Sequence, residues 1–222
     1  MYWLFIILFL QPLGGVVYLA AVILPELSGG KTARRIKQVA RERLDPEQAY
    51  REAGQALADT PSVRNRMRLA AAAAALGRHE EAEALYGEAA SGVHADDPAL
   101  LLGRAKALVE VGRPAEALGL LQRLGDLGEA GRTAEAALAM GRAHHALGQL
   151  TQADTAFSWA AERGSGLEGW ARYAAFLAET GRRVEAEAIL ADLDTRLPRI
   201  DQQHRTEAKR WRDHAAAALA GL

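Results

Sequence analysis

The sequence predicts an all-α protein in which stacked pairs of antiparallel helices form a solenoid, preceded by a single transmembrane helix. Three observations lead to this fold class. A glycine followed by a helical pattern recurs four times at nearly constant spacing within residues 63–199. Alanine dominates the same region. Residues 2–24 form one apolar run without a charged side chain.

The composition of the chain limits what it can do. At 222 residues it fits one domain with an appendage, and half of its residues are apolar, so it can bury a sizeable core. It contains no cysteine. Disulfide frameworks, cysteine-ligated zinc and thiol nucleophiles are therefore excluded.

Residues 1–28 are predicted to be a transmembrane anchor. Fourteen of the 23 residues in the run 2–24 are Leu, Ile, Val or Phe, and none is charged. As a helix this run would span roughly 34 Å, which is enough for a hydrocarbon core of about 30 Å. Pro12, Gly14 and Gly15 are expected to kink the helix.

Residues 29–44 are predicted to form a basic juxtamembrane linker or helix. Residues 29–43 carry six basic side chains and one acid, and the residues after them carry a net negative charge. By the positive-inside rule, the solenoid should be cytoplasmic and the protein a single-pass protein of a bacterial inner membrane. Anionic lipid headgroups are expected near Lys31, Arg34, Arg35 and Lys37, and no nucleic-acid partner is indicated.

The letters SGGKT at 28–32 match the end of a phosphate-binding loop at Gly30, Lys31 and Thr32. Such a loop needs glycine at its first position, where Pro25 stands here. Proline lacks the N–H that would bind a phosphate and cannot take the backbone angles of glycine. A nucleotide-binding enzyme using Gly30, Lys31 and Thr32 therefore stays only as an unfavoured alternative.

The repeated motif reads LGRHEEAEALY, VGRPAEALGLL, LGQLTQADTAF and TGRRVEAEAIL, with turn glycines at 77, 112, 148 and 181. Five residues after each glycine comes an alanine, and seven residues before it comes Ala or Gly. Two helices approach closely only where side chains are small. Glycine accepts the left-handed conformation that ends the first helix.

This pattern resembles the tetratricopeptide repeat, a pair of antiparallel helices about 34 residues long. The resemblance implies four repeats in 63–199, a degenerate half-repeat at 45–62 and a capping helix at 200–222. It also implies a concave groove lined by the first helix of each repeat. The groove positions that it transfers are Arg64, Met67, Leu102, Lys106, Leu138, Arg142 and His145.

The sequence contains no spacing of residues that is typical of a catalytic or metal-binding site. His144 and His145 are adjacent, so on a helix they point about 100° apart and cannot readily chelate one ion. We therefore expect no enzyme activity and no cofactor. The expected function is that of a membrane-tethered scaffold or adaptor binding a partner protein or peptide in the groove. The alternative is an envelope assembly factor whose solenoid faces the periplasm.

Overall fold

The computed structural model describes residues 46–221, and within them the protein is entirely helical, with no strand. The all-α prediction is therefore confirmed for this part of the chain. Its ten α-helices are α4 (Pro46–Asp59), α5 (Val63–Ala75), α6 (His79–Ala89), α7 (Pro98–Glu110), α8 (Pro114–Asp126), α9 (Ala134–Ala146), α10 (Leu150–Arg163), α11 (Glu168–Glu179), α12 (Arg183–Arg196) and α13 (Gln202–Ala220). Three short 3-10 helices join them at η2 (Gly92–His94), η3 (Gly128–Ala130) and η4 (Leu197–Arg199).

The chain divides into two compact units, Met1–Glu52 and Ala53–Leu222. Of the first unit, the structure describes only the beginning of α4. The predicted membrane span, the basic linker and the Gly30–Lys31–Thr32 segment lie outside the described residues. Among the helices of residues 46–221, none is long and apolar enough to cross a membrane.

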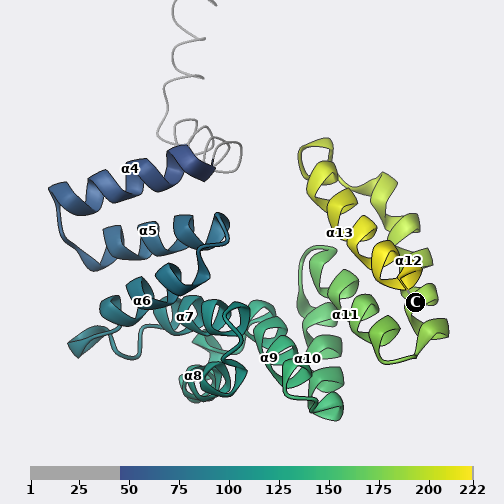
Figure 1. Ribbon diagram of the computed structural model, residues 1–222. Helices are drawn as coiled ribbons and strands as arrows, with labels where there is room; N and C mark the ends of the chain where they lie inside the picture. The colour runs from purple at the N-terminus through teal and green to yellow at the C-terminus, as the bar shows by residue number, and fades with distance from the viewer. Residues whose placement is uncertain (1–45, 222) are drawn as a thin grey trace, which may run out of the picture. The chain divides into compact units, whose positions relative to one another are not determined.

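In the second unit, helices that follow one another in the chain pack against one another (Figure 1). The helices form four pairs, and within each pair the two helices are joined by a turn of only three residues and run antiparallel. We number them pair one (α5, α6), pair two (α7, α8), pair three (α9, α10) and pair four (α11, α12). The first helices of pairs two, three and four also touch in succession, and α13 packs on α11 and α12. This arrangement is compatible with a helical-repeat solenoid.

Each of the four pairs turns at a glycine in the left-handed conformation. The φ angles of Gly77, Gly112, Gly148 and Gly181 lie between 71° and 82°. In every case the N–H of the next residue donates to the carbonyl five residues earlier, at 2.8 to 2.9 Å. This bond closes the end of the first helix as a Schellman motif does. The predicted turn geometry is confirmed at all four positions.

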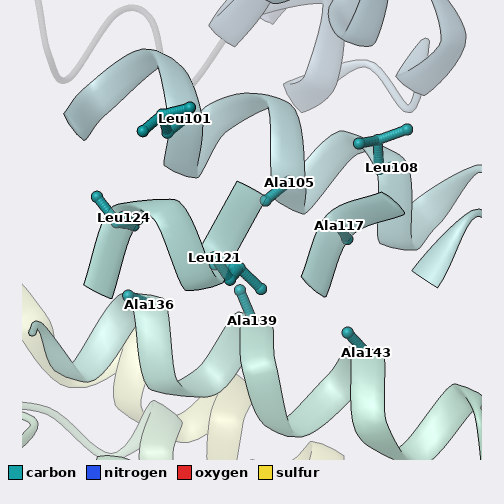
Figure 2. Close-up of a cluster of buried hydrophobic side chains, with 9 residues drawn as sticks. All are labelled: Leu101, Ala105, Leu108, Ala117, Leu121, Leu124, Ala136, Ala139 and Ala143. Atoms are coloured by element: carbon teal, nitrogen blue, oxygen red, sulfur yellow. The ribbon is translucent and has the colours of Figure 1, made fainter. Parts of the chain in front are cut away.

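Close helix contact occurs at the predicted small residues. The alanine five residues after each turn glycine is completely buried, and the small residue seven before it is buried as well. In pair two, Ala105 and Ala117 face each other beside Leu121 (Figure 2). The same cluster extends to three alanines of α9, so one core runs from pair two into pair three.

Aromatic side chains next to these contacts need extra room, which glycine provides. A Cβ on Gly141 would lie 2.9 Å from two ring carbons of Phe157 in the same pair. A Cβ on Gly103 would lie 2.5 Å from the Tyr86 ring of the preceding pair. Both distances are too short for a real carbon contact. Phe157 thus occupies the space beside a glycine of its own pair, whereas Tyr86 occupies the space beside a glycine of the next pair.

We predict energetic coupling between Gly141 and Phe157. Gly141→Ala should lower stability by about 1 kcal/mol, because overpacking outweighs the gain in helix propensity. Phe157→Leu alone should leave a void. The double variant reproduces the Ala105–Leu121 combination of pair two and should be more stable than the sum of the single effects by about 1 kcal/mol. Chemical unfolding of the four proteins checks this, and additivity within about 0.5 kcal/mol would contradict it.

Candidate partner-binding groove

A groove of about 910 Å³ lies within the second unit. Its walls are formed by α9, α11 and α13, and by the loop between α10 and α11. Lys106 of α7 completes one edge. This volume lies in the range of pockets that hold ligands.

Three of the seven predicted groove residues line this groove. They are Lys106, Leu138 and Arg142, which come from α7 and α9. The other four, Arg64, Met67, Leu102 and His145, are not among its lining residues.

Lys106 and Arg142 are held by carboxylates on the neighbouring first helix. Lys106 Nζ of α7 lies 2.6 Å from Glu135 Oε1 of α9. In the reverse direction, Arg142 Nη2 of α9 lies 2.7 Å from Glu110 Oε1 of α7. We call these two contacts the crossed ion pairs. Because each cation already has a carboxylate, an anionic partner must compete for it.

The four remaining predicted residues have other surroundings. His145 packs edge-on against the Phe176 ring, and its Nδ1 lies 3.7 Å from Glu179 Oε2. Arg64 is exposed on α5, and Met67 is half-buried on the same helix. Leu102 is half-buried against the core shared by pairs two and three.

The wall that α13 contributes was not predicted from the sequence. Trp211 of α13 and Trp170 of α11 both line the groove. Arg172 lies 4.7 Å from the centre of the Trp211 ring, and Arg196 lies 5.5 Å from that of Trp170. Neither tryptophan is among the seven groove positions that the repeat resemblance implies. No local pattern shows that the last helix folds back over α11 and closes one side of a groove.

The groove also contains charged groups contributed by η4 and α13. Arg199 and His204 are exposed, and neither side chain makes an ion pair or hydrogen bond with any of the residues 46–221. Asp201 lines the groove beside them. Both signs of charge are therefore present next to two indole rings. Within the described part of the chain, no three His, Asp or Glu side chains are grouped so that they could hold a metal ion.

A bidentate ion pair fastens α13 to α12. Arg212 Nε lies 2.6 Å from Asp194 Oδ1, and Nη2 lies 3.2 Å from Oδ2. The hydrogen bond from Arg212 lowers the pKa of the Asp194 carboxyl below its ordinary value. The pair therefore helps to hold the α13 wall of the groove in place.

We predict that Arg142→Glu lowers the melting temperature, because it sets a new carboxylate against Glu110. Adding Glu110→Arg should restore an ion pair with reversed polarity and recover most of the loss. Thermal unfolding followed by circular dichroism measures both steps. Equal melting temperatures for Arg142→Glu and the double variant would show that the pair has no energetic role.

We also predict that stability depends on pH through Asp194. A carboxyl whose pKa is lowered by folding stabilises the protein above its unfolded pKa, near 4, and this contribution is lost as the pH falls. Asp194→Asn should therefore lower stability at pH 7 by up to about 1 kcal/mol, as expected for an exposed pair. Its deficit should shrink below about pH 4. A deficit that stays constant between pH 7 and pH 3 would contradict this assignment.

A scan against protein-family models and a search of curated proteins gave no match. The function proposed for the chain therefore rests on the groove and on the repeat pattern.

Proposed function

We propose that this protein is a membrane-tethered scaffold or adaptor with a tetratricopeptide-like solenoid, which binds a partner protein or peptide in its groove. The observation that carries the proposal is the groove itself, which brings Lys106, Leu138 and Arg142 together with two tryptophans. The role proposed is non-enzymatic.

The chemistry of the groove suits a polypeptide ligand. Tryptophan and arginine are the residues that most often supply binding energy at protein interfaces, and here two arginines lie over two indole rings. Leu138 adds apolar surface between the charged groups. A segment carrying apolar and acidic side chains could use both kinds of contact. The crossed ion pairs would favour segments whose charges can replace them.

The tether is proposed from the sequence of residues 1–44. An uncharged apolar run followed by six basic residues supports a single span in a bacterial inner membrane with a cytoplasmic solenoid. Protease protection on intact cells and inverted vesicles tests this topology. Digestion of the solenoid in spheroplasts with an intact inner membrane would instead favour the periplasm-facing assembly factor.

We predict that a photo-crosslinking residue at Ser165 captures a partner in cells, whereas the same residue at Val184 does not. Ser165 is exposed and lines the groove, and it makes none of the ion pairs described above. Val184 is 79% exposed but is not a lining residue. Adducts of the full chain can be compared on a denaturing gel.

The control variant carries Arg142→Glu together with Glu110→Arg. It keeps an ion pair and the net charge but reverses the polarity that a ligand meets. The Ser165 adduct should weaken or disappear in this background. The same adduct from Ser165 and Val184, or an undiminished adduct in the swapped variant, would contradict recognition in the groove.

A further inference from the structure

Three junctions connect the four helix pairs, and they are not built alike. We number them junction one (α6 to α7), junction two (α8 to α9) and junction three (α10 to α11). Because the same repeat positions recur, each contact at one junction has an equivalent at the other two. The differences between these equivalents distinguish what the stack needs everywhere from what is particular to one place.

Junctions one and three share a polar clamp near the turns. At junction one, Glu83 accepts from Arg104 Nε at 2.8 Å and from Arg113 Nη1 at 3.4 Å. At junction three, Asp154 accepts from Tyr173 Oη at 3.0 Å and from Arg182 Nη1 at 2.6 Å.

The clamp residues occupy the same three positions of the repeat. The acid is six residues after one turn glycine, and its partners are eight before and one after the next turn glycine. Burial and then the hydrogen bond to Asp154 raise the pKa of Tyr173. A directional bond therefore ties a second helix to the following pair at both junctions.

Junction two lacks this clamp. Its equivalent positions hold Leu118, Met140 and Gln149. Leu118 and Met140 are half-buried against the shared core, and Gln149 is instead 2.6 Å from His144 of its own pair. Apolar contact between leucine and a flexible methionine has no preferred direction.

Junction two also lacks an interlocking ring. At junction one the Tyr86 ring lies where a side chain on Gly103 would stand. At junction three, the Phe157 and Phe176 rings pack with centroids 5.2 Å apart. At junction two, Leu121 and Leu124 lie against alanines of α9 (Figure 2). A face of alanines offers little resistance to sliding, which is the geometry of shear between packed helices.

The crossed ion pairs are the polar fastening of junction two, and they lie on the groove side. Lys106 and Glu135 have side chains 46% and 60% exposed, so salt can screen their attraction. Three of the four equivalent positions at junction one hold alanine, at 71, 75 and 99, so no crossed pair can form there.

We infer that junction two is the joint at which this solenoid shears, and that the charges in the groove hold it. Junctions one and three are fixed by clamps and rings that no groove ligand would touch. If the proposed partner binding is correct, an anionic segment that takes Lys106 or Arg142 releases the joint. By thermodynamic reciprocity, the position of the joint then sets the affinity for that segment.

The absence of cysteine allows a matched experiment on the full chain. Glu80, Ala115, Thr151 and Val184 are all exposed and all lie three residues after a turn glycine. Spin labels at 80 and 115, at 115 and 151, or at 151 and 184 therefore report junctions one, two and three in equivalent geometry. Pulsed electron–electron double resonance measures the distribution of distances between the two spin labels of each pair.

We expect the broadest distribution for the 115–151 pair. About 0.5 M NaCl, where the Debye length is roughly 4 Å, should broaden or shift this distribution more than the other two. The double variant Glu110→Gln, Glu135→Gln removes both carboxylates of the crossed ion pairs and should broaden or shift the 115–151 distribution as salt does. Distance distributions of equal width at the three junctions would overturn the assignment of the joint to junction two. A response to salt that is strongest at junction one or three would overturn it as well.

A clamp can also be grafted onto junction two. Leu118→Glu, Met140→Arg and Gln149→Arg reproduce the residues of junction one and should narrow the 115–151 distribution. The salt experiment needs no such substitution, so the joint remains testable even if this variant misfolds. A folded graft that leaves the 115–151 width unchanged would contradict the role assigned to the clamps.

A hexaglutamate peptide tests the coupling to ligand. It should shift the 115–151 distribution and leave the other two unchanged, and it should do so less in an Arg142→Gln variant. No shift would overturn the coupling. The Ser165 crosslink reports the proposed function separately, so a captured partner with a rigid junction two, or a mobile junction two without a captured partner, are distinguishable results.

Discussion

Two helices of a pair can lie close together only where neither carries a side chain larger than a methyl group. In every pair this condition is met by a buried alanine on the second helix, and on the first helix by alanine or, at Gly141, by glycine. Close approach brings the larger side chains beside these residues into contact, as Leu121 and Leu124 of pair two pack with the alanines of α9. Since each pair buries its apolar face only against its neighbours, a defect at one contact weakens two pairs at once.

The same steric condition decides where large rings fit. Tyr86 and Phe157 occupy equivalent repeat positions, but one is accommodated by Gly103 of the following pair and the other by Gly141 of its own pair. Close packing leaves no spare volume, so each ring requires a matching gap. Both rings also contact the following pair, Tyr86 at Gly103 and Phe157 at Phe176, and so help to fix its position. The leucines of pair two meet only alanines there and do not fix it in this way.

The charged side chains of the groove do not depend on this steric condition. Two of the cations predicted to meet a ligand, Lys106 and Arg142, already pair with carboxylates of the neighbouring first helix. A ligand would therefore gain only the difference between its own contacts and those that it replaces, which favours selectivity over raw affinity. The α13 wall adds the indole ring of Trp211, and Arg199, which also lines the groove, has no ion-pair partner among residues 46–221. The groove thus combines compensated and uncompensated charge.

The sequence by itself determined the helical class, the four turns and the small contact residues. These features depend on local chemistry, namely the left-handed conformation of glycine and a repeat period that brings alanines to one face. It also assigned seven groove positions by repeat register, of which Lys106, Leu138 and Arg142 line the groove. Only the tertiary structure decided that Glu135 and Glu110 pair with these cations, that α13 closes the groove, and that junction two has no clamp. Such contacts join side chains from different helices, and their partners depend on helix spacing and rotation that no single segment specifies.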